Sequence, residues 1–330
     1  MRVFVTAALW AEVLEELCQE HRVEVWPGPY PVPQGALRSG MKDADGVLSM
    51  LTDVVSAELL DAAPTLKVVA NMAVGFDNID VAAATRRGIL VTNTPDVLTE
   101  ATAEFTWTLI LALVRGLVPA RQALLDGAWT HWAHDGFLGR ELDGKTLGIV
   151  GLGRIGQAVA RRAAAFGMEV AALGERGAGP YPRLSRAEFL SRADVVSLHV
   201  PLTDETALMA DRSFFAAMKP GAFFVNIARG GLVDEAALLE SLEDGHLGGA
   251  ALDVFYKEPI DGRHSLARHP RILVTPHMGS ATLETRTAMA RRAVRNLRAA
   301  LAGQRPRDLV NPAAYGRRGT EGSRLSETNT

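Results

Sequence analysis

The sequence predicts an α/β protein of two domains, in each of which a parallel sheet carries helices on both faces. Its 330 residues are enough for about two domains. Apolar residues make up 48% of the chain and charged residues 22%, which is ordinary for a folded globular protein. Short β-rich runs alternate with helical patterns in two successive regions, and this alternation is typical of parallel sheets covered by helices.

The first region, residues 1–98, contains short apolar runs separated by helical segments or loops. We expect strands at 2–5, 23–26, 46–50, 66–70 and 89–91. Apolar residues near helical spacing predict helices at 9–19, 56–62 and 81–87. The four prolines within residues 27–33 predict a loop.

The second region, residues 99–288, opens with two helical stretches and continues with the same alternation. We expect helices at 99–115 and 119–127, and strands at 146–150, 170–173, 195–200, 223–226, 249–252 and 272–275. A long helix at 282–302 follows the last strand. We expect it to return to the first domain, which then comprises residues 1–98 and 289–316, and we expect the polar residues 317–330 to form a flexible tail.

Charge and cysteine content narrow the class of protein. The formal net charge of −3 argues against nucleic acid or an anionic membrane as a partner. Five arginines within residues 286–298 are interpreted as the solvated face of a helix. Because Cys18 is the only cysteine, a disulfide within the chain and a cysteine-based zinc site are excluded. We expect no metal site and a reducing, cytoplasmic location.

Two hydrophobic segments bear on targeting and membrane insertion. The N-terminal MRVFVTAALW has no basic region, long apolar core or small-residue cleavage site, so we expect no secretion signal. The most apolar run, residues 105–114, is about ten residues long, whereas a bilayer-spanning helix needs roughly 20. We therefore expect that run to be a buried core helix.

A glycine-rich turn between a strand and a helix indicates a dinucleotide site. The strand at 146–150 is followed by Gly151-Leu152-Gly153-Arg154-Ile155-Gly156 and then by a helical stretch. In this G-x-G-x-x-G pattern the first glycine permits a tight turn, the second lets a diphosphate approach the backbone, and the third allows close helix packing. A glycine-rich loop without a ligand is the alternative. The strand before it and the helix after it favour a Rossmann-type cofactor domain.

The residues after the second strand of that domain bear on the choice of cofactor. The acid that would bind the ribose 2′-OH of NAD is expected about 18 residues after Gly156, where this chain has Gly174. Arg176 favours the 2′-phosphate of NADP, whereas Glu175 could bind a free 2′-OH. We predict NADP (or NAD), with a lower KM for NADPH than for NADH.

Three charged or titratable residues lie just beyond predicted strands of the second region. Arg229 follows the strand at 223–226, Glu258 the strand at 249–252, and His277 the strand at 272–275. Ligands of open α/β sheets bind beyond the carboxyl ends of strands, so the three could reach one site. A guanidinium can bind a carboxylate with two parallel hydrogen bonds, and an imidazole can transfer a proton near neutral pH.

A carboxylate on the other ring nitrogen would orient the imidazole and favour its charged form, and Glu258 is the candidate. Taken singly, each of the three is equally well a surface ion-pair partner, a solvated acid or a structural histidine. His199 also lies near a strand end but has no evident acidic partner, so we interpret it as structural or cofactor-adjacent.

These segments resemble the D-isomer-specific 2-hydroxyacid dehydrogenase family over about residues 1–312. The resemblance is carried by GLGRIG (151–156), VSLHVPLTDET (196–206), NIARGGLVDE (226–235), ALDVFYKEP (251–259) and TPHMGS (275–280). The segment ANMAVGFDNID (70–80) is most similar to the glyoxylate/hydroxypyruvate reductase branch. The resemblance implies a Rossmann-type cofactor domain, a flavodoxin-like substrate domain with a cleft between the two, and a homodimer.

The resemblance also implies the reaction and its residues. A hydride would pass from NAD(P)H to glyoxylate or hydroxypyruvate, giving glycolate or D-glycerate. Arg229 would contact the substrate carboxylate and carbonyl, and His277, paired with Glu258, would donate the proton. Leu51 and the backbone amides of Val74 and Gly75 would complete the substrate site. The cofactor would be bound by Gly151, Gly153, Arg154, Ile155, Gly156, Glu175, Arg176, Thr206, Ile227, Ala228, Asp253 and Gly279.

Other interpretations stay open. The substrate could be pyruvate, phosphite or a compound like 3-phosphoglycerate, whereas formate dehydrogenases carry glutamine where this chain has Glu258. A dinucleotide-sensing corepressor is disfavoured because we see no long extension. Trp129 and Trp132 could close the substrate site, pack in the core or form a dimer interface. The segment 177–184 is shorter than the corresponding segment of relatives. Contacts on the adenosine side beyond Arg176 are therefore not predicted.

Overall fold

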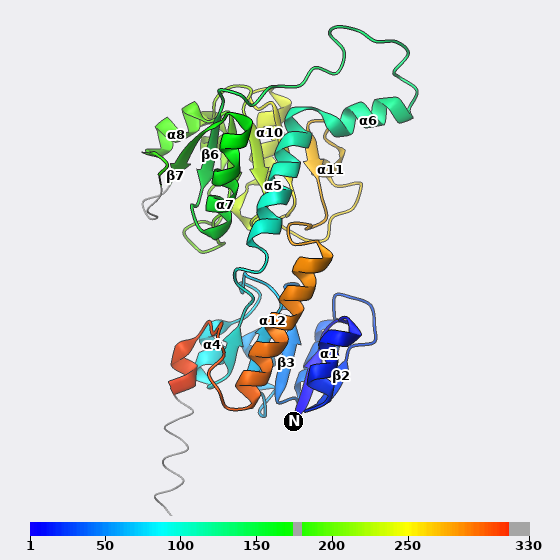
Figure 1. Cartoon of the computed structure of the whole chain (residues 1–330), viewed down its shortest axis with the longest axis vertical. Coiled ribbons are helices and arrows are strands. Elements are labelled where there is room, and N and C mark those ends of the chain that lie inside the picture. Colours follow the sequence, from blue (N-terminus) through cyan, green and yellow to red (C-terminus); the bar gives the residue numbers. More distant parts are fainter. Residues whose placement is uncertain (174–179, 317–330) are drawn as a thin grey trace, which may run out of the picture. The chain divides into compact units, whose positions relative to one another are not determined.

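The computed structural model describes residues 1–173 and 180–316. It divides into two compact units (Figure 1): unit 1 comprises Met1–Leu98 and the described residues from Thr282 onward, and unit 2 comprises Thr99–Ala281. The chain therefore returns from unit 2 to unit 1 between Ala281 and Thr282, before the last long helix. We expected this boundary at residues 288–289, within that helix. The predicted tail, 317–330, lies outside the described residues.

Unit 1 is built on a five-stranded parallel sheet with the order β2-β1-β3-β4-β5. The strands are β1 (Arg2–Val5), β2 (Arg22–Val25), β3 (Gly46–Ser49), β4 (Val68–Asn71) and β5 (Leu90–Thr92). Every residue of β3, β4 and β5 is buried, as expected for parallel strands covered on both faces. This order is that of flavodoxin-like sheets, and the five predicted strands all form, with small shifts of their ends.

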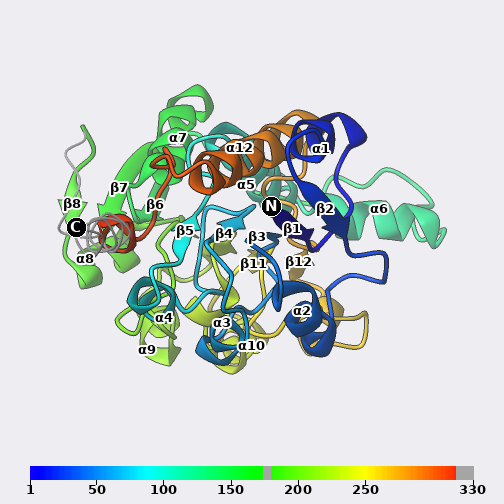
Figure 2. The ribbon, with the colours of Figure 1, turned by 90° about the horizontal axis from the view of Figure 1, so that it is seen from below.

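Helices cover both faces of this sheet (Figure 2). The helices α1 (Ala11–Cys18) and α12 (Leu283–Leu301) lie on one face, and α2 (Gln34–Met41), α3 (Ala57–Asp61) and α4 (Val81–Arg86) lie on the other. Helix α2 was not predicted from the sequence, because its two glycines weaken the helical pattern. Tertiary packing explains the helix, because Leu37 and Met41 are buried and Gly40 lies directly against the ring of Phe4.

The segment after α12 completes the edge of the sheet at β5. The Val310 amide donates to the Val91 carbonyl at 2.8 Å, and the Val91 amide donates to the Asn311 side chain at 2.8 Å. These bonds pair backbone groups that an edge strand would otherwise leave open. Unit 1 is therefore assembled from both ends of the chain.

Unit 2 is built on a seven-stranded parallel sheet with the order β12-β11-β10-β9-β6-β7-β8. The strands are β6 (Thr146–Val150), β7 (Glu169–Leu173), β8 (Arg183–Leu184), β9 (Val195–Leu198), β10 (Phe223–Asn226), β11 (Gly249–Leu252) and β12 (Ile272–Val274). The chain order reverses between β6 and β9, which is the switch point where Rossmann-type sheets bind dinucleotides. The two-residue strand β8 was not predicted because so short a run carries no pattern.

Two separate hydrophobic cores lie on the two faces of this sheet. One contains residues of α5 (Thr99–Val114) and α7 (Arg154–Ala163). The other contains residues of α8 (Arg186–Arg192), α9 (Arg212–Ala217) and α10 (Glu235–Glu243). The short α11 (Ser265–Arg268), also not predicted, contacts β12. The predicted fold class, two parallel sheets each with helices on both faces, is confirmed.

The apolar helix α5 is a core helix of unit 2, and its Trp107, Leu109 and Ile110 are buried. Among the described residues, no single helix is long and apolar enough to cross a membrane. Only α5 taken together with α6 (Leu117–Leu125) passes that test, and the pair is bent by 60° at the break.

Candidate active site

The glycine turn after β6 has the geometry that a dinucleotide requires. Gly151 has φ +96°, and a Cβ there would lie 2.7 Å from the carbonyl oxygen of His199, so only glycine fits. A Cβ on Gly156 would overlap the Gly151 carbonyl, so the first turn of α7 packs directly on the loop. Gly153 faces open space and is the N-cap of α7, where it makes no side-chain cap. In the first turn of α7, the amides of Ile155 and Gly156 suit a phosphate.

The other described residues that were predicted to bind the cofactor lie beyond the carboxyl ends of the strands of unit 2. Thr206 holds the loop after β9, since its hydroxyl donates to the Pro201 carbonyl at 2.7 Å and accepts from the Thr203 amide. Ile227 and Ala228 directly follow β10, and Ile227 lies 3.3 Å from where a Cβ on Gly279 would be. Glu175 and Arg176, which were also predicted to bind the cofactor, lie outside the described residues.

His277 and Glu258 form a direct pair. Nδ1 of His277 lies 2.8 Å from Oε2 of Glu258, and each side chain is 27% exposed. Burial works against ionisation of Glu258, but the hydrogen bond and the charge of His277 outweigh it, so the pKa of Glu258 lies below its ordinary value. An ionised Glu258 accepts a hydrogen bond from Nδ1–H, and this leaves Nε2 as the ring atom that can exchange a proton with a ligand.

Asp253 fixes the turn that carries His277. Its carboxylate is fully buried and accepts hydrogen bonds from the Thr275 hydroxyl at 2.6 Å and from the amides of Met278 at 2.7 Å and Gly279 at 2.8 Å. Burial raises the pKa of Asp253, against these three bonds. His277 itself has φ +55°, a left-handed conformation that the surrounding bonds must hold. Asp253 was predicted to line the cofactor site, and in the structure its oxygens are occupied by this turn.

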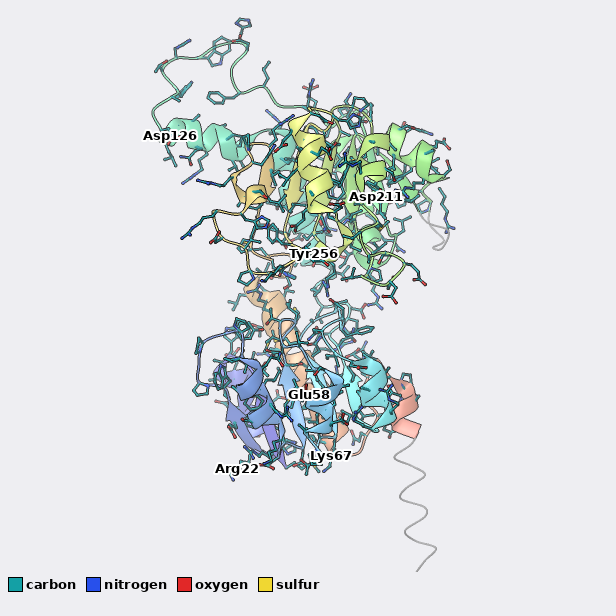
Figure 3. All side chains as sticks on the ribbon, turned by 180° about the vertical axis from the view of Figure 1, so that it is seen from behind. Arg22, Glu58, Lys67, Asp126, Asp211 and Tyr256 are labelled. Carbon is teal, nitrogen blue, oxygen red and sulfur yellow. The ribbon has the colours of Figure 1, made fainter. Side chains whose placement is uncertain are left out.

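Arg229 lies in the loop after β10, next to the loop that carries Glu258. The guanidinium charge acts on Glu258 and helps to lower the pKa of that carboxyl. The two loops touch at Gly230, where a Cβ would overlap the backbone of Phe255 and Tyr256. Figure 3 labels Tyr256 in this second loop. The structure thus brings Arg229, Glu258 and His277 together at the carboxyl ends of three neighbouring strands.

His199 does not have the properties of a proton donor. Its Nε2 lies 2.9 Å from the Ser197 hydroxyl, and burial lowers the pKa of His199 to about 4. The imidazole is therefore neutral near pH 7. The backbone carbonyl of His199 packs against Gly151. This supports its interpretation as a structural residue beside the glycine turn.

In unit 1, the turn after β4 presents backbone amides. The carbonyl of Ala73 accepts from the Thr94 amide at 2.8 Å, that of Val74 from Asn93 Nδ2 at 2.7 Å, and that of Gly75 from Asn71 Nδ2 at 2.9 Å. The amides of Val74 and Gly75 donate to no group within residues 1–173 and 180–316. A turn whose carbonyls are held and whose amides are open suits an anion such as a carboxylate.

Leu51 lies on a neighbouring turn of unit 1. It follows β3, which pairs with β4, and its side chain is 37% exposed. An exposed leucine beside open amides can limit the size of a bound acid. Trp129 and Trp132 of unit 2 are also exposed, at 53% and 79%, so packing of these two rings in a core is excluded.

Comparison with known proteins decides the family. A family model described as D-isomer specific 2-hydroxyacid dehydrogenase, NAD binding domain, matches residues 107–279. A protein named glyoxylate reductase from Aeropyrum pernix is 46% identical over 321 residues, covering 94% of this chain and 96% of the relative. The chain belongs to the D-isomer-specific 2-hydroxyacid dehydrogenase family. The resemblance seen in the sequence motifs is confirmed, and this dehydrogenase is an NAD(P)-dependent oxidoreductase.

Solved structures agree with the family. A Thermus thermophilus protein is 47% identical with a TM-score of 0.90, over 94% of this chain and 100% of that one. An NADPH-dependent glyoxylate/hydroxypyruvate reductase from Sinorhizobium meliloti, in complex with NADP and malonate, is 34% identical with a TM-score of 0.81. That match covers 95% of this chain and 97% of the relative.

The residues that hold the functional loops were not predicted from the sequence. The glycine at 230 was quoted only as part of a motif, and the asparagines Asn71 and Asn93 were not singled out. Their signal is faint: each asparagine ends or directly follows an apolar strand of unit 1. A polar side chain at such a position has backbone groups of the next loop within reach.

Replacing Glu258 by Gln tests the histidine pair. Reduction needs a charged imidazole, and Glu258, ionised above its lowered pKa, stabilises that charge across neutral pH. The neutral amide does not, so we expect the alkaline fall in reduction rate to move by about one pH unit toward acid. The measurement is kcat/KM for a 2-keto acid from pH 5 to 9.

Glu235→Gln is the matched control. Glu235 accepts from the Tyr256 amide at 2.8 Å, on the same loop, and an amide oxygen can accept that bond equally well. Its profile should match wild type. A Glu258→Gln profile that also coincides with wild type would show that the pair does not act in the reaction.

Replacing Gly230 by Ala tests the contact between the Arg229 and Glu258 loops. The methyl group overlaps backbone atoms, so the loops must separate, and we expect kcat/KM to fall by about 100-fold, the cost of a misplacement of roughly 1 Å. The control is Gly231→Ala, whose Cβ meets only the flexible end of Leu202 at 2.9 Å. Equal activities of the two variants would contradict the packing described.

Proposed function

We propose that this dehydrogenase reduces small 2-keto acids with NADPH, and that its substrates are glyoxylate and hydroxypyruvate, giving glycolate and D-glycerate. The observation that carries the proposal is the 2.8 Å contact between His277 Nδ1 and Glu258 Oε2, with the charge of Arg229 acting on the same carboxylate. The relative from Aeropyrum pernix is named a glyoxylate reductase, which supports this choice of substrate.

The residues around the glycine turn fit a nicotinamide dinucleotide. The diphosphate would lie against the uncapped start of α7, where Gly153 leaves the approach open. When bound, the nicotinamide supplies the hydride. Ile227, Ala228 and Gly279, on the loops after β10 and β12, would line the nicotinamide half of the site.

His277 moves the proton in this proposal. Its Nδ1 is held by Glu258, so the ring presents Nε2 in a fixed orientation. Nε2 would donate its proton to the carbonyl oxygen of the keto acid as that oxygen gains charge. Glu258 would stabilise the imidazolium before the transfer, and the pair is recharged from solvent afterwards.

Each unit offers donors that suit the carboxylate of a keto acid. In unit 2, Arg229 has a planar guanidinium, whose geometry matches a carboxylate. In unit 1, the open amides of Val74 and Gly75 offer donors that need no reorganisation, because four backbone carbonyls of residues 73–76 are already bonded. Leu51 would border this subsite.

The preference for NADPH rests on the chain after β7. The acid expected to bind a free ribose 2′-OH is absent, since the position holds Gly174, and Arg176 follows. These residues are outside the described structure. The Sinorhizobium meliloti reductase is described as NADPH-dependent, whereas a D-lactate dehydrogenase from Aquifex aeolicus, 29% identical, was solved with NAD.

We also propose a homodimer. The helix α6 has no buried residue, and it projects with the following loop away from the sheet of unit 2 (Figure 1). This arm exposes large apolar side chains, namely Leu117, Val118, Leu124, Leu125, Trp129, Trp132, Phe137 and Leu138. So much exposed apolar surface is typical of an interface between protein chains.

A cytoplasmic location is proposed as well. The one cysteine, Cys18, is exposed and free. An exposed free thiol suits a compartment in which thiols stay reduced.

The reaction is tested by steady-state kinetics at 340 nm with glyoxylate, hydroxypyruvate and pyruvate, each with NADPH and NADH. We expect glyoxylate and hydroxypyruvate to have the highest kcat/KM, and NADPH to have a lower KM than NADH.

His277→Ala should lower kcat by about 10²–10⁴-fold, the usual contribution of general acid catalysis. Arg229→Lys should raise KM for the keto acid, because an ammonium is not a planar fork.

Three results would contradict the proposal. Inactivity toward every 2-keto acid would overturn it entirely, and full activity of His277→Ala would remove the assigned proton donor. A clear preference for NADH would overturn the choice of coenzyme while leaving the reaction class in place.

The dimer is tested by light scattering after gel filtration. Leu125→Glu places a charge on the exposed arm, and we expect it to give monomers because the charge would be buried in the interface. The control is Leu283→Glu, at an exposed leucine of unit 1, which should remain dimeric. A monomeric wild-type protein would rule out the proposed assembly.

A further inference from the structure

Two loops of unit 1 lie side by side at the carboxyl edge of its sheet. Residues 50–55 follow β3 and carry Leu51, and residues 72–78 follow β4 and carry Val74 and Gly75. Because β3 and β4 pair directly, the loops begin next to each other. Neither loop belongs to a helix or a strand, so their backbone groups need partners outside the regular hydrogen-bond ladder.

Asn78 connects the two loops. Its Nδ2 donates to the Met50 carbonyl at 3.2 Å and to the Asp53 carbonyl at 2.9 Å, both in the first loop. Its own backbone carbonyl accepts from the Val55 amide at 2.8 Å. Three bonds from one residue of the second loop thus hold the first loop at both of its ends.

Asn71 extends this connection to the turn with the open amides. Its Nδ2 donates to Asn78 Oδ1 at 3.2 Å and to the Gly75 carbonyl at 2.9 Å. Asn71 is fully buried at the end of β4, and its Oδ1 accepts from the Ser49 hydroxyl at 3.3 Å. The position of Gly75 is therefore coupled through two amide side chains to the position of Leu51.

The opposite side of the first loop is anchored in the sheet. The buried carboxylate of Asp53 accepts from the Thr6 hydroxyl at 2.5 Å and from the Met50 amide at 2.7 Å. The first loop is thus attached to Thr6, the residue directly after β1, and to the second loop through Asn78. Asn78, a residue of the second loop, thus bonds the first loop through its side chain and also bonds Asn71 at the end of β4.

We propose that Asn78 is a positioning residue for substrate: it sets the distance between Leu51 and the Val74–Gly75 amides, and so selects a short 2-keto acid by its carboxylate. The inference rests on the proposed function, because it takes those amides as the carboxylate subsite. Asn78 acts through the loops and touches no reacting atom. Its role concerns binding of the acid, whereas the glycine turn of unit 2 is built from other residues.

An asparagine is required by the bonding pattern. The groups that face Nδ2 are all acceptors: the Met50 and Asp53 carbonyls and, at 3.5 Å, Asn71 Oδ1. An NH₂ group can donate to both carbonyls, while the Oδ1 atom accepts from Asn71. An aspartate at this position would place a carboxylate oxygen against two carbonyl oxygens. A serine keeps one donor but is too short to reach both carbonyls together.

The test compares Asn78→Asp and Asn78→Ser with wild type. We expect KM for glyoxylate and the inhibition constant of oxamate, a non-reducible carboxylate analogue, to rise at least about tenfold, because the donors are misplaced. The KM for NADPH should stay within about twofold of wild type, since the coenzyme residues are unchanged. If the aspartate variant does not fold, the serine variant, which introduces no charge, provides the same test.

Asn311→Asp is the matched structural control. Asn311 is a buried asparagine of the same unit whose Nδ2 donates to the Ile89 carbonyl at 2.9 Å and the Thr85 hydroxyl at 3.0 Å. It contacts β5 rather than the two loops. We expect it to lower the melting temperature as the Asn78 variants do, with unchanged KM for glyoxylate and unchanged inhibition by oxamate.

The outcomes separate the inference from the proposed function. If wild type reduces glyoxylate but the Asn78 variants keep its KM and oxamate inhibition, the inference is overturned and the function stands. Equal changes in KM for glyoxylate and for NADPH, or equal effects of Asn311→Asp, would also overturn it, because they indicate general loss of structure. If wild type reduces no 2-keto acid, both fall.

Discussion

The common direction of the strands is the constraint on which the functional geometry depends. In a parallel sheet every strand ends at the same edge, so the loops that follow successive strands gather there. In unit 2 this edge receives the glycine turn after β6, Arg229 after β10, Glu258 after β11 and His277 after β12. In unit 1 it receives Leu51 after β3 and the Val74–Gly75 turn after β4.

Loops at such an edge lie beyond the regular ladder of strand hydrogen bonds, so their backbone groups need other partners. In each unit, buried polar side chains supply some of these partners. Asp253 accepts from the turn that carries His277, and Asn71 donates to the turn that carries Gly75. The groups that these side chains do not engage are those that we propose to bind substrate: Nε2 of His277 in unit 2, and the amides of Val74 and Gly75 in unit 1.

The strands were predictable because parallel strands buried on both faces are nearly continuous apolar runs. Helices with a clear apolar face were equally evident, and α12 was placed to within about a residue at each end. The helix α2 was missed because its glycines and few apolar residues give no period, and it forms by packing of Leu37, Met41 and Gly40 on unit 1. Strand β8 and helix α11 were missed because two to four residues carry no pattern.

Residue types and their order along the chain determined the two parallel sheets, the glycine turn and the identity of the three residues expected to act on substrate. A strand followed by a functional residue is a local pattern, so it can be found without coordinates. Only the tertiary structure decided which polar groups meet: that Nδ1 of His277 faces Glu258, that Gly230 packs against the backbone at Phe255, and that Asn78 joins two loops. These contacts join residues from different strand ends, and their distances depend on how the strands are ordered and twisted in the sheet, which no local pattern encodes.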